Sequence, residues 1–301
     1  PFAKEKHEFL GTLTPLAFES FDFSPYDLVI SVTSEAAKGI ITKPGTFHVS
    51  YVLTPTRYLW SGYDIYFPKG SLLRDISAPA VSYLKKWDRI AAQRPDVMIA
   101  ISGAVKKRIS RYYGRDSEVI YPPVDTERFK MKAARKENFF LFVGRLVPYK
   151  RVDLAVKAFN KLGLPLVIIG KGSQEKRLKA MAKENIKFIP ELTDAKLADY
   201  YRKCTALVLP QEEDFGIVAL EAQAAGTPVI AYKAGGALDT VIAGTTGIFF
   251  DKQSVGSLVR AVKKIKRLKF NSQDLVKNAE RFSKENFKKN FTNLLAKHGR
   301  F

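Results

Sequence analysis

The chain has 301 residues, of which 46% are hydrophobic and 12% aromatic, so it can bury two domain cores and is not a disordered polypeptide. Its single cysteine, Cys204, excludes an internal disulfide and fits a reducing compartment, and its three scattered histidines form no metal-binding motif. With 50 Lys and Arg against 30 Asp and Glu, the formal net charge is +20. This charge favours an anionic partner, whether nucleotide, phospholipid surface or nucleic acid, without choosing among them.

In the first half of the chain, short apolar runs alternate with helical stripes. Strands are predicted at residues 27–31, 47–52, 97–100 and 119–121, and helices at 81–93 and 103–113. The segment 122–138 begins with two prolines and is predicted to be a linker. A Rossmann-like half needs an opening strand and a glycine-rich turn, which residues 1–26 lack. We therefore expect the first domain to be cut short at its N-terminal side.

The second half shows the same alternation more clearly. Strands are predicted at 139–144, 164–170, 186–189, 206–209, 228–231 and 247–250, with helices at 152–162, 175–182, 194–202 and 216–225. Lysine-rich helices follow at about 253–268 and 272–298. The predicted fold class is α/β, with two Rossmann-like domains that face each other across a cleft. The expected domains are residues 1–125 and 136–285, followed by a C-terminal helix over 286–301.

The segment 211–228 carries the clearest sign of a binding site. A predicted strand stops and three acids follow, Glu212, Glu213 and Asp214. Phe215 and Gly216 then open an apolar stretch that is predicted to be a helix buried on all sides. This helix contains Glu221, which needs a polar partner in such a place. A strand end, an acidic turn and a helix start together indicate the position where open α/β sheets bind ligands.

Two segments, FVGRLVPYKRVDLAVKAF (142–159) and EEDFGIVALEAQAAGTPVIAYKAGGALDTV (212–241), resemble the retaining glycosyltransferases of family 4, which have the GT-B fold. The segments at 18–44, 54–60 and 100–125 resemble a bacterial mannosyltransferase-like branch, so the resemblance covers essentially the whole chain. It implies transfer of a sugar, with mannose favoured, to a lipid-linked or saccharide acceptor in surface polysaccharide synthesis. It also implies a cytoplasmic enzyme that is peripheral at the inner face of the cell membrane.

The resemblance assigns roles to individual residues. Glu213 and Glu221 match the E-x7-E pair of the family, and Arg145 and Lys150 lie in an upstream GR-x4-K pattern. By resemblance, Arg145 and Lys150 hold the donor diphosphate, Glu213 contacts the sugar, and Glu221 binds the ribose hydroxyls. Glu213, Arg145 and Lys150 are the predicted catalytic residues. The predicted donor site also includes Gly144, Gly170, Lys171, Asp214, Phe215, Gly216 and Ile217.

The expected donor is a nucleoside diphosphate sugar, with GDP-mannose favoured, and no cofactor is implied. Departure of the diphosphate needs fixed positive charge, which Arg145 and Lys150 would supply. Because the chain has neither a D-x-D motif nor a histidine cluster, we expect transfer without a metal. The main alternatives are a family-4 transferase that uses a UDP-sugar and a nucleotide-binding relative without turnover. An anionic membrane surface is a predicted partner, and no nucleic-acid motif is present.

The motif TPTRYLW at 54–60 places Thr54, Arg57 and Tyr58 on the acceptor side by resemblance. The family usually has a histidine before this motif, and this chain has Leu53 instead, which puts its catalytic competence in question. His48 is close in sequence but is predicted to pack within its own strand.

Overall fold

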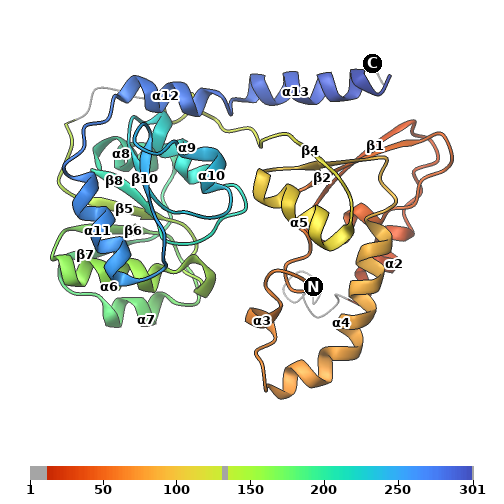
Figure 1. Ribbon diagram of the computed structural model, residues 1–301, viewed down its shortest axis with the longest axis horizontal. Coiled ribbons are helices and arrows are strands. Elements are labelled where there is room, and N and C mark those ends of the chain that lie inside the picture. The colour runs from red at the N-terminus through yellow and green to blue at the C-terminus, as the bar shows by residue number, and fades with distance from the viewer. Residues whose placement is uncertain (1–11, 131–134, 300–301) are drawn as a thin grey trace. The chain divides into compact units, whose positions relative to one another are not determined.

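Two parallel β-sheets organise the chain in a computed structural model that describes residues 12–130 and 135–299 (Figure 1). By their contacts the residues form two units, residues 1–121 with 295–301, and residues 122–294. The first unit has a four-stranded sheet in the order β1-β2-β3-β4, and the second a six-stranded sheet in the order β10-β9-β8-β5-β6-β7. Neighbouring strands pair in parallel in both sheets. The predicted α/β class with two Rossmann-like sheets is confirmed, and the first sheet is the smaller.

The first unit alternates strands with helices. Its strands are β1 (Leu28–Thr33), β2 (Phe47–Val52), β3 (Val97–Ala100) and β4 (Glu118–Val119). Its helices are α2 (Thr14–Glu19), η2 (Ala37–Gly39), α3 (Tyr63–Tyr66), α4 (Leu72–Ala91) and α5 (Gly103–Tyr113). The predicted start of α4 at residue 81 is wrong. Ser71 caps the helix by accepting a hydrogen bond from the Arg74 N–H at 3.3 Å, and Pro79, which usually breaks helices, lies inside it.

The second unit contains the remaining strands, β5 (Phe140–Val143), β6 (Leu166–Ile169), β7 (Ile186–Ile189), β8 (Ala206–Leu209), β9 (Val229–Tyr232) and β10 (Gly247–Phe250). Its helices are η3 (Pro148–Lys150), α6 (Val152–Leu162), α7 (Glu175–Met181), α8 (Asp194–Lys203), α9 (Ile217–Ala224), α10 (Ala237–Thr240), α11 (Val255–Ile265) and α12 (Ser272–Glu280). Helix α13 (Lys284–Lys297) starts in this unit, and its residues from Leu295 onward belong to the first unit.

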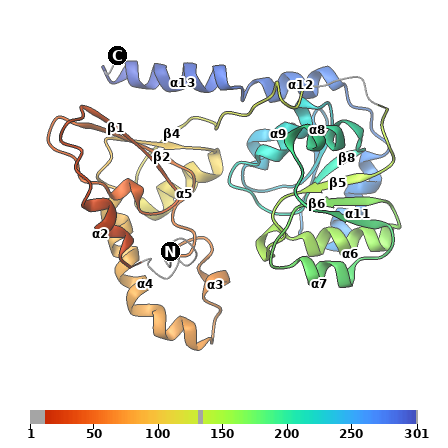
Figure 2. The same cartoon turned by 180° about the vertical axis from the view of Figure 1, so that it is seen from behind.

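Helices cover both faces of the six-stranded sheet (Figure 2). On one face, residues of α6, α7 and α11 form a core with strand residues such as Phe140 and Ile168. On the other face, residues of α8, α9 and α12 pack with Leu141 and Val167. Successive strand residues thus point into opposite cores, which explains why these strands are apolar throughout. The strand order reverses between β5 and β8, and the carboxyl ends of such neighbours are where doubly wound sheets bind ligands.

The single helix predicted over 272–298 is wrong, since α12 ends at Glu280 and α13 begins at Lys284. Phe282 lies between the two helices, and its side chain is buried with its ring 5.7 Å from that of Phe215. Its carbonyl also accepts a hydrogen bond from the Val124 N–H at 2.8 Å. These tertiary contacts replace helical hydrogen bonds at this point.

Candidate active site

The carboxyl ends of β5 and β8 bring two distant charged residues together. Lys150 ends η3, which follows β5, and Glu213 lies in the acidic turn that follows β8. The Lys150 Nζ is 2.5 Å from Glu213 Oε1, and the two side chains are 16% and 15% exposed. Gln211 Nε2 donates to the same carboxylate oxygen at 2.6 Å. Two of the three predicted catalytic residues therefore form one ion pair at the edge where this class of sheet binds ligands.

Tyr149 lies beside both cations of the predicted diphosphate site. Its hydroxyl accepts a hydrogen bond from Arg145 Nη2, and the Lys150 ammonium lies 5.5 Å from its ring centroid. Arg145 itself is exposed just beyond β5. Tyr149 was not among the predicted site residues, although an aromatic residue between the Arg and Lys of the GR-x4-K pattern was a visible signal.

Two glycines hold the main chain of the acidic turn. The Gly236 N–H donates to the Glu213 carbonyl at 2.8 Å, and Gly235 pairs with Glu213 in an isolated parallel bridge. A Cβ on Gly235 would lie 2.2 Å from the Glu213 carbonyl oxygen, and one on Gly236 would lie 2.3 Å from Phe215 Cα. Any side chain at either position would displace the turn that carries Glu213. Sequence reasoning gave these glycines no role, although two consecutive glycines often mark a close backbone approach.

The residues at the start of α9 offer a ligand their main-chain groups more than their side chains. Gly216 is the N-cap residue with φ 97°, a conformation that favours glycine. Phe215 is 4% exposed and belongs to the core, so only its main chain is available to a ligand. Asp214 is half-buried and Ile217 is exposed. The first N–H groups of α9 therefore lie next to the acidic turn, and a helix start favours an anion.

The sequence predicted that helix α9 is buried on all sides, and this prediction is wrong. Ile217 is 44% exposed, and Glu221, one turn further along the same face, is half-buried. The buried hydroxyl of Tyr201 on α8 donates to Glu221 Oε2 at 2.8 Å, which supplies the polar partner that a glutamate here requires. Within residues 12–130 and 135–299, Glu221 Oε1 has no hydrogen-bond partner.

The environment of Glu221 raises the pKa of its carboxyl group. Burial is the main cause, and the Asp194 carboxylate adds to it, while the Tyr201 hydroxyl and the Arg128 guanidinium act in the opposite direction. Arg128 also pairs with Asp194 and Asp125, so this cation is shared among three carboxylates. A group that donates hydrogen bonds to Glu221 Oε1 would stabilise its charged form.

The loops after β5 and β6 pack tightly against each other. A Cβ on Gly170, which has φ 142°, would lie 2.1 Å from the Gly144 carbonyl oxygen. The Leu146 N–H donates to the Lys171 carbonyl at 2.8 Å, while Lys171 itself is exposed. By resemblance, Gly170 belongs to the predicted donor site. The close approach in the structure is to the neighbouring loop, which carries Gly144 and Arg145.

The predicted acceptor-side residues lie in the first unit. Thr54 is buried, and its hydroxyl has no hydrogen-bond partner among the described residues. Arg57 is half-buried. Burial is the largest cause of a raised pKa at Tyr58, with further contributions from the carboxylates of Glu35 and Asp88.

The same motif is bound to α4 through hydrogen bonds to Asp88, which also forms a buried ion pair with Lys38. Lys38 Nζ lies 2.5 Å from Asp88 Oδ1, and the two side chains are 2% and 1% exposed. Thr56 Oγ1 donates to Asp88 Oδ1 at 2.9 Å, and Trp60 Nε1 donates to Asp88 Oδ2 at 2.7 Å. Thr56 and Trp60 therefore position the segment that carries Thr54, Arg57 and Tyr58. The sequence analysis did not identify this structural part of the motif.

His48 packs within β2, as predicted. Its Nε2 lies 2.9 Å from Ser31 Oγ, and burial lowers the pKa of its imidazole to about 4. Among the residues that the structure describes, no three His, Cys, Asp or Glu side chains form a group that could hold a metal ion.

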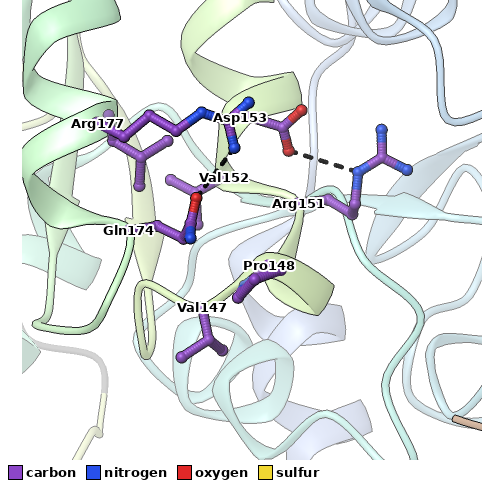
Figure 3. A pocket seen from close by; sticks show the side chains of 8 residues that line it. Val147, Pro148, Arg151, Val152, Asp153, Gln174 and Arg177 are labelled. Carbon is purple, nitrogen blue, oxygen red and sulfur yellow. Dashed lines mark hydrogen bonds and ion pairs between the residues drawn. The ribbon is translucent and has the colours of Figure 1, made fainter. Parts of the chain in front are cut away.

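A small pocket lies beside η3, between the starts of α6 and α7 (Figure 3). Its volume is ≈ 200 Å³, and its polar lining consists of Arg151, Asp153, Gln174 and Arg177. Figure 3 shows Arg151 directed at Asp153 and Arg177 at Gln174. This volume is below the range of about 300–1,000 Å³ that is typical of ligand pockets. The pocket is therefore too small to enclose a nucleoside diphosphate sugar.

The family model that matches the chain is "Glycosyl transferases group 1", over residues 123–282. An uncharacterized glycosyltransferase of Methanocaldococcus jannaschii is 29% identical over 202 residues, which make up 65% of this chain and 57% of that protein. The D-inositol 3-phosphate glycosyltransferase of Acidothermus cellulolyticus is 30% identical over 210 residues, or 59% and 46% of the two chains. The chain thus spans about half the length of the curated relatives it matches.

Solved structures show the same fold. Sucrose-phosphate synthase from Thermosynechococcus elongatus matches with a TM-score of 0.73 and 20% identity, over 96% of this chain and 79% of that one. The span matched by the family model, residues 123–282, contains Arg145, Lys150, Glu213 and Glu221.

Proposed function

Since this chain belongs to the glycosyl transferases of group 1, we propose that it transfers a hexosyl group from a nucleoside diphosphate sugar to a hydroxyl acceptor, with retention of configuration. The observation that carries the proposal is the ion pair of Lys150 and Glu213 at the carboxyl ends of β5 and β8. It combines a cation suited to a diphosphate with a carboxylate suited to sugar hydroxyls, at the edge where such sheets bind nucleotides.

The two cations would stabilise the leaving group. As the bond between sugar and phosphate breaks, the diphosphate gains negative charge, and fixed positive groups lower the energy of that state. Arg145 is exposed beyond β5, and Lys150 is held nearby by Glu213. When the diphosphate binds, it would take over Lys150, so that Glu213 becomes available to the donor sugar. No metal has a part in this proposal.

Glu221 would bind the ribose hydroxyls of the donor. Tyr201 occupies one oxygen of its carboxylate, and the other has no partner in the described part of the chain. An ionised carboxylate accepts hydroxyl hydrogen bonds well, and these would also return its raised pKa toward the ordinary range. Tyr201 is fully buried and would hold the carboxylate in one orientation.

The finer parts of the proposal rest on the sequence resemblance. They are GDP-mannose as donor, a lipid-linked or saccharide acceptor of surface polysaccharide synthesis, and a peripheral position at the inner face of the membrane. A UDP-sugar donor is the alternative within the same chemistry. A relative that binds nucleotide without turnover is the alternative outside it, and Leu53 in place of histidine is the observation that favours it.

A thermal-shift panel with GDP-, UDP- and ADP-sugars tests the donor, since a ligand that binds only the folded state raises its melting temperature. We expect one nucleotide class to raise it and its free diphosphate to do the same. No shift with any of the three would contradict the proposed donor site. Turnover by the purified protein then separates an enzyme from a binding relative.

Paired substitutions test the roles of the two glutamates. Glu221→Gln should weaken binding of donor and free nucleoside diphosphate alike, whereas Glu213→Gln should preserve affinity for the free nucleotide and lower kcat. Glu212→Gln, in the same turn, is the matched control. Calorimetry and steady-state kinetics on the same proteins distinguish these profiles, and identical profiles for both variants would mean that the pair is structural.

A further inference from the structure

Helices α3 and α4 of the first unit present an apolar surface, the α3–α4 tip, which consists of Ile65, Tyr66, Leu72, Leu73 and Ile76. These side chains are 61%, 48%, 74%, 58% and 70% exposed. The buried residues of α4 all lie in its second half, from Val81 onward. In Figure 1 the first half of α4 extends away from the sheet of its unit. Aliphatic side chains that are exposed together to this extent mark a surface that contacts something else.

Basic residues border the tip and form the cation band, which consists of Lys69, Arg74, Lys85, Lys86 and Arg89. Of these, Arg74 forms an ion pair with Asp64 of α3 at 2.7 Å. Three of them stack on aromatic rings: Arg74 and Lys85 lie 4.6 and 4.3 Å from the Tyr63 ring centroid, and Arg89 lies 4.9 Å from that of Trp60. Lys69 and Lys86 are exposed. Asp64 and Asp75 are the exposed acids of α3 and α4, so cations outnumber acids on this surface.

We propose that the α3–α4 tip docks the protein on the surface of an anionic phospholipid bilayer, with the cation band at the lipid phosphates. An apolar tip beside cations and amphipathic aromatic rings matches the boundary between acyl chains and headgroups. A second copy of the chain would fit less well, because it would bring two cation bands together. The proposal rests on the peripheral membrane position given under the proposed function and locates its surface. It uses none of the residues of the candidate active site, so its failure would leave the proposed glycosyl transfer untouched.

The geometry of α4 corresponds to a helix that lies at the interface and does not cross it. None of the described helices combines the length and hydrophobicity of a membrane span. Leu72, Ile76, Tyr83 and Ile90 follow one exposed side of α4, and Val81, Leu84 and Ala91 are buried on the other. The outward stripe would contact lipid while the inward stripe holds α4 on its own unit.

Vesicle sedimentation tests the apolar part of the proposal. The variant Leu72→Gln/Leu73→Gln/Ile76→Gln should bind vesicles of phosphatidylcholine and phosphatidylglycerol at least ~10-fold more weakly, because each replacement removes one aliphatic side chain that would enter the bilayer. The variant Ile41→Gln/Ile242→Gln/Leu268→Gln also replaces three exposed aliphatic side chains by glutamine, at positions outside the tip. It should bind like the unsubstituted protein. Equal binding by both variants would overturn the proposal. Unchanged melting temperatures would show that both variants are folded.

A second pair of variants tests the cation band. Lys69→Gln/Lys86→Gln should lower binding to the anionic vesicles by about 10-fold or more. Binding to vesicles of phosphatidylcholine alone should not change. Lys176→Gln/Lys252→Gln is the control for a general loss of charge. An equal loss in both pairs would place the electrostatic attraction outside the tip and contradict the proposal.

Site-specific labelling tests immersion directly. The native Cys204 is buried, so an environment-sensitive dye would react at Leu72→Cys and, in a separate control, at Ile41→Cys. Anionic vesicles should shift the emission of the dye to shorter wavelength at residue 72 alone. No shift at residue 72, or a tip-dependent dimer by light scattering without any vesicle binding, would overturn the proposal in favour of a protein contact.

Discussion

Asp88→Asn should destabilise the first unit more than any other conservative change at a single carboxylate of α4. The Asp88 side chain is 1% exposed and pairs with Lys38, which is 2% exposed. It also accepts hydrogen bonds from Thr56 and Trp60. In the variant, the Lys38 ammonium would remain buried without a counter-charge, and the new amide N–H₂ would face groups that are themselves donors.

The expected loss is about 3–5 kcal/mol of the free energy of unfolding, the range for removal of one partner from a buried ion pair. Removing both charges should cost less. In Lys38→Met/Asp88→Asn the amide oxygen can still accept from Thr56 or Trp60, and no buried charge is left. We therefore expect the double variant to be more stable than Asp88→Asn by about 2 kcal/mol, a result that two independent destabilising substitutions could not give.

Urea unfolding followed by tryptophan fluorescence measures this effect. The chain has two tryptophans, Trp60 and Trp87, and both lie in the first unit, so the signal reports that unit. Asp75→Asn on the exposed side of α4 is the matched control and should change stability by less than about 0.5 kcal/mol. Two results would refute this role of the ion pair: a stability of Asp88→Asn within about 1 kcal/mol of the unsubstituted protein, or a double variant no more stable than Asp88→Asn.

Three further predictions concern the candidate site and β2. Arg145→Ala and Lys150→Ala should each lower turnover by about 10²-fold or more, as loss of a charge partner of the transition state typically does; near-normal rates in both would remove the assignment. Activity should persist in EDTA, and a complete loss that magnesium or manganese restores would contradict metal-independent transfer. His48 is neutral in the fold with a pKa of about 4, whereas the unfolded chain takes up its proton below about 6.5. His48 therefore contributes about 3 kcal/mol to the free energy of unfolding above pH 6.5, and this contribution is lost as the pH falls toward 4. His48→Gln should lack this part of the pH dependence of urea unfolding, and equal pH dependence in both proteins would mean that His48 does not titrate in this way.

The sequence alone determined the strands and the fold class. The predicted strands at 47–52, 97–100, 186–189, 206–209 and 247–250 agree with the structure residue for residue. These strands are buried by helices or by neighbouring strands, so they appear in the sequence as short apolar runs between turn residues. The prediction failed where a local signal competed with tertiary contacts, as at Pro79 inside α4 and at Phe282 between α12 and α13.

Only the tertiary structure decided which charged groups meet. Lys150 and Glu213 are 63 residues apart, and Lys38 and Asp88 are 50 apart. Sequence patterns could place Glu213 after a strand and Lys150 before a helix, but they could not show the contact between them. That contact depends on the order of β5 and β8 in the sheet, which is determined by how the helices pack on both faces. The same holds for Tyr201 and Glu221, because the partner that makes a buried glutamate tolerable comes from a different helix.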